Sequence, residues 1–144
     1  MITRQADYAV RSVLDLALRP DEQAAFSRDI AERQSIPGSF VAKILTRLAR
    51  VGIVQTQRGI TGGVKLSRPA AEVSLLEVIE AIDGPIALNL CVRGPDLCPL
   101  EENCRVHPIW EVLNLDLRQR LGRISFADLA EAEGHWTLDL VGGA

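Results

Sequence analysis

Three cysteines and a histidine lie within one short stretch of this 144-residue chain. Six, five and two residues separate the successive members of the set, which are Cys91, Cys98, Cys104 and His107. Cysteine thiolates hold iron–sulfur clusters, and an imidazole can replace one thiolate. The same four ligands can also enclose a zinc ion in a tetrahedral structural site. The spacing alone therefore leaves three interpretations open: a cluster, a zinc ion, and cysteines that bind nothing.

The composition argues against several other kinds of protein. Three cysteines are an odd and sparse set, which does not suit a disulfide framework. The sequence has no run of about 20 apolar residues and no leader-like start, so we expect a cytoplasmic protein without a membrane partner. It also shows no nucleophile–base pair and no phosphate-cradling loop between a strand and a helix, so we do not expect an enzyme.

Charge is divided unevenly between the two halves of the chain. Residues 1–69 hold 11 Lys and Arg against 6 Asp and Glu, whereas residues 70–144 hold 5 against 13. An excess of positive charge in one half is typical of a surface that binds a polyanion such as DNA. Unevenly distributed solvated side chains would give the same numbers, so the charge supports nucleic-acid binding without deciding it.

The spacing of apolar residues predicts a mainly α-helical fold with one small β-hairpin. Three helices are expected in the first 51 residues, the first capped by Thr3, the second capped by Ser27 and the third with Pro37 in its first turn. Residues 53–57 and 64–66 have the composition of strands, and the glycine-rich segment between them predicts a hairpin.

The second half of the chain predicts four more segments. The irregular residues 86–104 carry the cysteines, and a longer helix is expected from about His107 to a stop at Gly122. Two pairs of residues have the pattern of capping boxes at the starts of helices, namely Ser74 with Glu77 and Ser125 with Asp128.

A short helix, a tight turn, a longer helix and a hairpin, in this order, predict a winged helix-turn-helix, whose second helix enters the major groove. The buried face of that helix is expected to consist of Phe40, Val41, Ile44, Leu45 and Leu48. The DNA-contacting residues are expected to be Ser39, Lys43, Arg47 and Arg50 on the helix, with Arg58, Gly62 and Gly63 on the wing. An ordinary helical domain with a hairpin is the alternative.

The longer helix carries an apolar stripe that is a candidate dimer interface. Val106 and Arg120 lie at its two ends, and the residues assigned to dimerisation are Ile109, Trp110, Leu113, Leu117 and Leu121. The stripe either packs on its own domain or pairs with a second chain. A two-fold dimer would place its two reading helices about 34 Å apart and would prefer a palindromic operator in double-stranded DNA.

Four segments together resemble one known family. They are residues 7–11 (DYAVR), 36–45 (IPGSFVAKIL), 58–66 (RGITGGVKL) and 74–84 (SLLEVIEAIDG), and the resemblance extends over roughly residues 1–133. These segments are similar to those of the Rrf2 family of bacterial winged-helix regulators. The resemblance implies a homodimer that binds promoter DNA, usually as a repressor.

The resemblance also implies an iron–sulfur cluster. IscR-like members hold a two-iron cluster with three loop cysteines and a histidine, and Cys91, Cys98, Cys104 and His107 match these positions with one extra residue between the first two cysteines. NsrR-like members hold a four-iron cluster with three cysteines and an aspartate from the partner's first helix, which corresponds to Asp7 of the partner subunit. A two-iron cluster with His107 is favoured, with the four-iron cluster and Asp7 as the alternative.

We therefore expect four segments with separate roles. These are a DNA-binding winged helix-turn-helix domain (1–85), a cluster loop (86–106), a dimerisation helix followed by a short helix (107–134), and a tail (135–144). The expected function is a transcriptional regulator whose promoter affinity is controlled by a cluster that senses redox state, nitric oxide or iron–sulfur status. The alternative is a zinc-stabilised DNA-binding or interaction module without redox sensing.

Overall fold

The computed structural model describes residues 1–19, 23–60 and 62–134. Within these residues the chain forms six α-helices and one two-stranded antiparallel sheet, which confirms the predicted fold class. The elements are α1 (Arg4–Ala17), α2 (Ser27–Gln34), α3 (Gly38–Arg50), β1 (Val54–Gln57), β2 (Gly63–Leu66), α4 (Leu75–Asp83), α5 (His107–Arg123) and α6 (Phe126–Glu131). Short 3-10 helices are η1 (Ala70–Glu72), η2 (Leu90–Val92) and η3 (Glu101–Asn103). The predicted tail, 135–144, lies outside the described residues.

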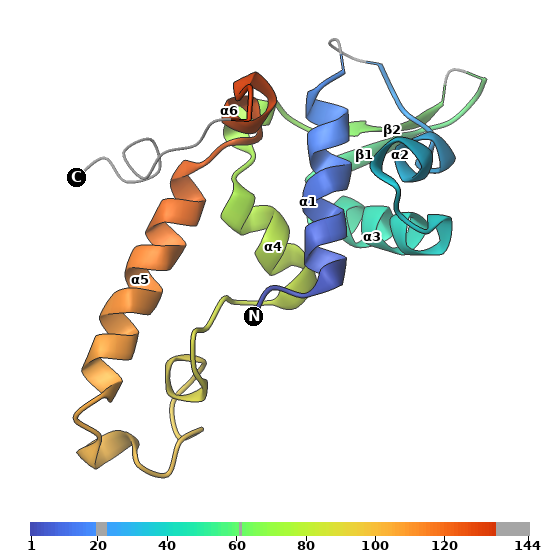
Figure 1. The fold of residues 1–144 in the computed structure, drawn as a ribbon. Helices are drawn as coiled ribbons and strands as arrows, with labels where there is room; N and C mark the ends of the chain where they lie inside the picture. Colours follow the sequence, from blue (N-terminus) through green and yellow to red (C-terminus); the bar gives the residue numbers. More distant parts are fainter. Residues whose placement is uncertain (20–22, 61, 135–144) are drawn as a thin grey trace.

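The helices α1 to α4 and the hairpin pack together, whereas α5 and the cysteine loop form a long arm beside them (Figure 1). One hydrophobic core holds the packed part together, and α1 lies at its centre between α3 and α4. The small side chains of Ala6 and Ala9 are fully buried on α1, which lets neighbouring helices approach closely. Leu48 of α3 and Val78 of α4 are also fully buried in this core.

The hairpin is the wing of the fold, and a third chain segment extends it. Val54 pairs with Leu66 and Gln57 with Gly63 in the antiparallel register. Ala25, in the connection between α1 and α2, forms two backbone hydrogen bonds of 2.8 Å with Val64 of β2. This pairing joins the base of the wing to the helical core.

The chain returns to the core after α5. Phe126, at the start of α6, is fully buried, and its N–H donates to the carbonyl of Val73 at 3.0 Å. The N–H of Leu75 donates to the carbonyl of Ile124 at 2.8 Å. These contacts fix one end of α5 to the packed half, while the cysteine loop lies near its other end (Figure 1).

Three expected helix boundaries are wrong. Phe26 rather than Ser27 is the N-cap of α2, because the pairing of Ala25 keeps the chain extended up to that residue. Pro37 has a ψ of 128° and therefore precedes α3 as its N-cap instead of lying in its first turn. Gly122 lies inside α5, which continues to Arg123 because the extended backbone begins only at Ile124.

Two further expectations need correction. Phe40 is 37% exposed rather than buried, and it contacts the ring of Tyr8 edge-on at a centroid distance of 5.7 Å. Ser74 accepts from the N–H of Glu77 at 3.2 Å, but Glu77 binds Arg68 instead of completing a capping box. The box between Ser125 and Asp128 is confirmed in both directions. Among the described residues, no helix is both long and apolar enough to cross a membrane.

Candidate DNA interface and cysteine loop

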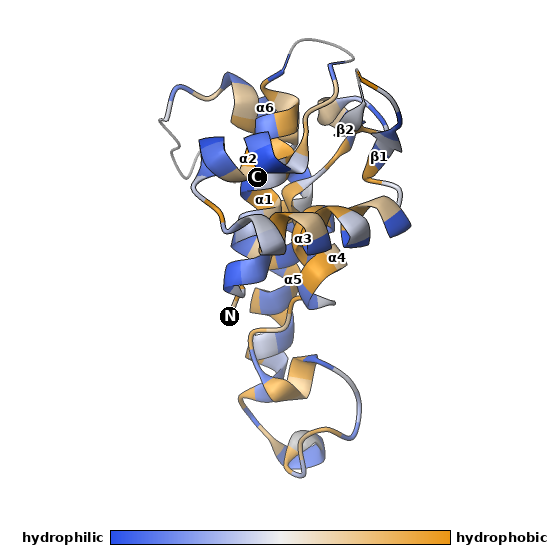
Figure 2. Ribbon diagram, turned by 90° about the vertical axis from the view of Figure 1, so that its right-hand side faces the viewer, coloured by the Kyte–Doolittle hydropathy of each residue, from blue (hydrophilic) through white to orange (hydrophobic). Residues whose placement is uncertain are grey.

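The outer face of α3 presents most of the polar residues expected to contact DNA. Ser39, Lys43 and Arg50 are exposed on this face, while Val41, Ile44, Leu45 and Leu48 turn the opposite face into the core. Figure 2 looks onto this side of the molecule, with α3 across its middle and the wing above it. The amphipathic sequence of α3 therefore places hydroxyl and cationic groups on one exposed helical surface.

Arg47 differs from its neighbours on α3, because its side chain is already bound within the protein. Its Nη2 donates to the carbonyl oxygen of Ile82, at the end of α4, over 2.5 Å. A carbonyl at a helix end lacks its intrahelical partner, so a guanidinium is a favourable donor for it. The structure thus gives Arg47 a role in holding α3 against α4, and its contact with DNA stays a prediction.

The wing contains two glycines that the local packing requires. A Cβ on Gly63 would lie 2.6 Å from the carbonyl oxygen of Ala25, and the φ of +131° is unfavourable for other residues. A Cβ on Gly62 would lie equally close to the carbonyl oxygens of Gln57 and Gly59. Both glycines therefore shape the wing whether or not they approach DNA.

Two side chains at the tip of the wing face solvent. Arg58 is exposed, as expected of a residue that contacts the DNA backbone. Ile60 is 99% exposed and was not among the residues predicted to contact DNA. Its position between Gly59 and Gly62 could have indicated this exposure, because an isolated apolar residue in a glycine-rich turn has no neighbours to bury it.

An ion pair with one buried partner, the carboxylate of Asp15, supports the helix-turn-helix. Arg33 of α2 makes two hydrogen bonds, of 2.9 and 2.7 Å, to the carboxylate of Asp15 on α1, and Gln34 adds a third of 3.2 Å. Burial by itself raises the pKa of Asp15, but the hydrogen bonds from Arg33 and Gln34 outweigh it and hold the pKa below its ordinary value. Local sequence patterns do not predict this pair, because its members are 18 residues apart.

The structure places the predicted cluster ligands along the loop without gathering them into a metal site. Cys91 lies in η2 and is buried, whereas Cys98 and Cys104 are half-buried, and all three are free thiols. Within residues 1–19, 23–60 and 62–134, no three His, Cys, Asp or Glu side chains lie close enough to bind one metal ion. The ligand set therefore stays a prediction.

His107 and Asp7, the two candidates for the fourth ligand, have different surroundings. The Nε2 of His107 lies 3.3 Å from the carboxylate of Glu111, and its Nδ1 is buried without a hydrogen-bond partner in the described part of the chain. A buried nitrogen without a partner is uncommon in folded proteins. Asp7 is exposed near the start of α1 and pairs with Arg11 at 3.0 Å. The orphaned nitrogen favours His107.

The proposed dimerisation residues divide into two groups on α5. Ile109 is 52% exposed and Leu113 44%, so they are free for a partner. The half-buried group consists of Trp110, Leu117 and Leu121, of which Leu121 packs against the core. Val112, at 62%, is a further exposed apolar residue that the sequence analysis missed. Hydrophobic segments also occur along the cysteine loop, at the lower end of Figure 2.

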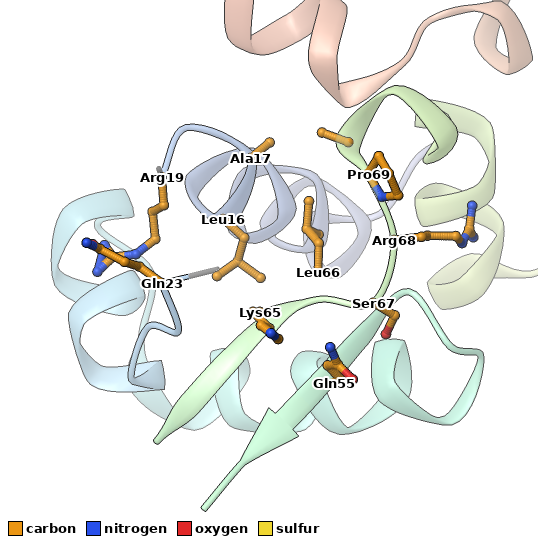
Figure 3. A pocket seen from close by; sticks show the side chains of 11 residues that line it. Leu16, Ala17, Arg19, Gln23, Gln55, Lys65, Leu66, Ser67, Arg68 and Pro69 are labelled. Atoms are coloured by element: carbon orange, nitrogen blue, oxygen red, sulfur yellow. The ribbon is translucent and has the colours of Figure 1, made fainter. Parts of the chain in front are cut away.

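Of the hollows in the described part of the chain, two lie away from both α3 and the three cysteines. One, of about 460 Å³, separates the end of α1 from the base of the wing and has Arg19, Lys65 and Arg68 in its wall (Figure 3). Neither α3 nor a cysteine lines it, so it is separate from the candidate sites. The other, of about 530 Å³, lies where the N-terminus, the end of α4 and α5 meet, and it adjoins the start of the cysteine loop.

Comparison with known proteins identifies the same architecture. A family model named Rrf2 and described as an iron-dependent transcriptional regulator matches residues 2–132. The HTH-type transcriptional regulator IscR of Xenorhabdus nematophila is 34% identical over 130 residues, which make up 90% of this chain and 79% of that protein. IscR of Photorhabdus laumondii is 33% identical over 141 residues, covering 98% of this chain and 84% of its own.

Solved structures support the fold. IscR of T. potens superimposes with a TM-score of 0.73 at 22% identity, covering 90% of this chain and 85% of its own. CymR, described as the global cysteine regulator of B. subtilis, gives 0.74 at 20% identity, covering 90% and 95%. The family and these relatives are regulators of transcription rather than enzymes. The chain therefore belongs to the Rrf2 family and is a DNA-binding, winged-helix regulator of transcription.

Proposed function

We propose that this regulator is a dimeric repressor whose affinity for promoter DNA is set by an iron–sulfur cluster on its cysteine loop. The observation that carries the proposal is the contrast between the loop and its surroundings. Between Gly84 and the start of α5, Cys91 is the only described residue that is buried. A loop with so little core of its own takes its shape from what its cysteines bind.

The ligand residues suit a group of soft chemistry. We assign Cys91, Cys98 and Cys104 as three ligands and His107 as the fourth, with Asp7 of the partner subunit as the alternative. Thiolates select iron–sulfur clusters and zinc over hard cations, and the Nδ1 of His107 has no hydrogen-bond partner in the described part of the chain. When bound, a two-iron cluster would supply bonds to the thiolates that oxidation or nitric oxide can break. The description of the family as iron-dependent supports iron over zinc.

The chain itself connects the loop to DNA binding. His107 is the first residue of α5, so a ligand bound there would fix the start of that helix relative to the cysteines. The exposed residues Val106, Ile109, Val112 and Leu113 form an apolar strip that we assign to the dimer interface. A two-fold dimer formed through α5 would present two reading helices to a palindromic operator with half-sites about 34 Å apart.

The test begins with anaerobic purification and an absorption spectrum, with iron, sulfide and zinc measured on the same sample. An operator is selected from random DNA duplexes, and its affinity is measured by fluorescence anisotropy before and after the metal is removed. We expect a coloured protein with two irons per chain and an operator affinity that changes about tenfold or more, as a typical coupling between two sites would give. Equal affinity of the loaded and metal-free proteins contradicts control by a cluster.

Two variants make this experiment more specific. Cys98→Ser should abolish cluster loading, whereas Arg93→Ala, an exposed change in the same loop, should leave it intact. A colourless protein with one zinc per chain would instead support the second candidate, a zinc-stabilised DNA-binding module without redox sensing. The Cys3His ligand set is the observation that favours this candidate.

A further inference from the structure

The root of the cysteine loop, residues 86–88, is held in place by a buried side chain of α5. Asn114 is the only buried residue of α5, with 9% of its surface exposed. Its Oδ1 accepts from the N–H of Leu88 at 3.0 Å, and its Nδ2 donates to the carbonyl of Ile86 at 3.3 Å. These two backbone groups lie in an irregular segment, where no helix or sheet partner satisfies them. Asn114 therefore fixes where the loop leaves the packed half.

The last turn of α4 also holds residues 86–88, from the side opposite α5. One carboxylate oxygen of Glu80 accepts from the N–H of Ile86 at 2.9 Å. The same carboxylate binds the guanidinium of Arg118 on α5, with one contact of 2.8 Å and another of 3.3 Å. A two-point contact between a guanidinium and a carboxylate fixes orientation as well as distance. Residues 86–88 are thus held between α4 and α5.

Within three residues of Glu80, the same turn also holds α3 and α1. The carbonyl of Ile82 accepts from Arg47 of α3. The carboxylate of Asp83 accepts from the N–H of Thr3 at 2.9 Å and from its hydroxyl at 2.5 Å, and Thr3 is the N-cap of α1. One helical turn therefore has polar links to the loop root, the reading helix and the central helix of the core.

We propose that Asn114 and Glu80 are positioning residues, and that the last turn of α4 couples the order of the cysteine-loop root to the position of the reading helix within one protomer. A displacement of residues 86–88 moves Glu80. Because the turn is rigid, Ile82 moves with Glu80, and Arg47 moves with Ile82. Such coupling needs a continuous set of packed, directional contacts, and these contacts provide one. This inference rests on the proposed function, because it gives the loop a route to the DNA-binding face that does not pass through the dimer interface.

The experiment measures amide hydrogen exchange in the full-length, metal-free protein without DNA. We expect Asn114→Ala to speed exchange of the Leu88 N–H, which loses its acceptor, by about fivefold, the factor that corresponds to the loss of one ordinary hydrogen bond. The N–H of Ile86 keeps Glu80 as its acceptor and should change less. Exchange in the second half of α3 should rise by about twofold or more. Asn114→Asp keeps the acceptor for Leu88 and should give a smaller change. Gln119→Ala, on the exposed face of the same helix, is the matched control and should change neither segment.

A second variant tests the route itself. Arg47→Ala removes the link between α4 and α3, so Asn114→Ala should add no further change in α3 when it is placed in that background. The coupling proposal is wrong if Asn114→Ala loosens the loop and leaves α3 unchanged. It is also wrong if its effect on α3 is equal in the two backgrounds, because a general loss of stability would act in both. Neither result depends on a bound metal, so failure here is distinct from failure of the cluster proposal.

Discussion

The packed half and the arm made of the cysteine loop and α5 are stabilised in different ways. The packed half contains almost the whole hydrophobic core, from Ala6 to Ile82, together with Phe126 of α6. Among its described residues, the arm (84–123) buries only two, Cys91 and Asn114. The first region is therefore held by its own core, whereas the second has almost no core of its own.

The polar groups of the two regions show the same difference. In the packed half, the buried carboxylate of Asp15 joins α1 to α2, so it holds together two elements that also share a core. In the arm, Asn114 binds backbone groups of a segment that has little core around it. A polar contact adds to packing in the first case and replaces it in the second, which is why the arm is the part of the molecule suited to change shape.

The largest expected effect separates the two regions by their cores. Leu48→Ala, at a fully buried position of α3, should lower the free energy of unfolding by about 3 kcal/mol, because it removes buried methyl groups and leaves a cavity. Leu115→Ala, at a position of α5 that is 58% exposed, should stay within about 0.5 kcal/mol of the wild type. Urea unfolding followed by circular dichroism measures both. Similar losses in the two variants would show that α5 has a core of its own.

The next effect concerns the exposed strip of α5. Ile109→Asp should convert the dimer to a monomer and weaken operator binding by about a hundredfold, since the two reading helices would no longer bind as one unit. Sedimentation velocity and anisotropy measure the two quantities. Leu115→Asp is the matched control, because Leu115 is similarly exposed, at 58% against 52%, but lies about 120° round the helix from Ile109. If the Ile109→Asp variant still dimerises as the wild type does, the interface lies elsewhere.

A smaller effect tests the ion pair between Asp15 and Arg33 through its dependence on pH. The pKa of Asp15 is lowered in the folded state, so its stabilisation is complete above the ordinary carboxyl value of 3.8 and is lost as the pH falls below it. Asp15→Asn should lower stability at pH 7 by about 2 kcal/mol, as expected for hydrogen bonds to a charged group. Thermal unfolding between pH 3 and pH 7 should show the difference from wild type narrowing towards low pH. A constant difference across this range would contradict the charge-dependent role.

The smallest effect concerns the reading face. Lys43→Ala should weaken operator binding about fivefold and reduce the slope of log affinity against log salt by about one, with an unchanged melting temperature. Arg47→Ala should lower the melting temperature as well, because its guanidinium binds the carbonyl of Ile82. Arg105→Ala, in the cysteine loop, is the control for the loss of one exposed positive charge. An equal effect of Lys43→Ala and Arg105→Ala would show that the contact is not specific to α3.

Much of the packed half could be predicted from local sequence patterns. The period of apolar residues located α1 and α3, and the glycines located the wing, because these signals lie within a few residues of one another. The ends of helices were less predictable. The start of α2 depends on Ala25 pairing with Val64, a contact between residues 39 positions apart that no local pattern contains.

The sequence by itself determined the order of the elements, the set of cysteines and the family, since these depend on residue types and short spacings. Only the tertiary structure decided that Arg47 binds Ile82, that Thr3 binds Asp83, and that Asn114 holds the loop root. Thr3 and Asp83 are 80 residues apart, and Asn114 and Leu88 are 26 apart. Such contacts arise from how helices pack in space, and hydrophobic periodicity records only which face of each helix is buried.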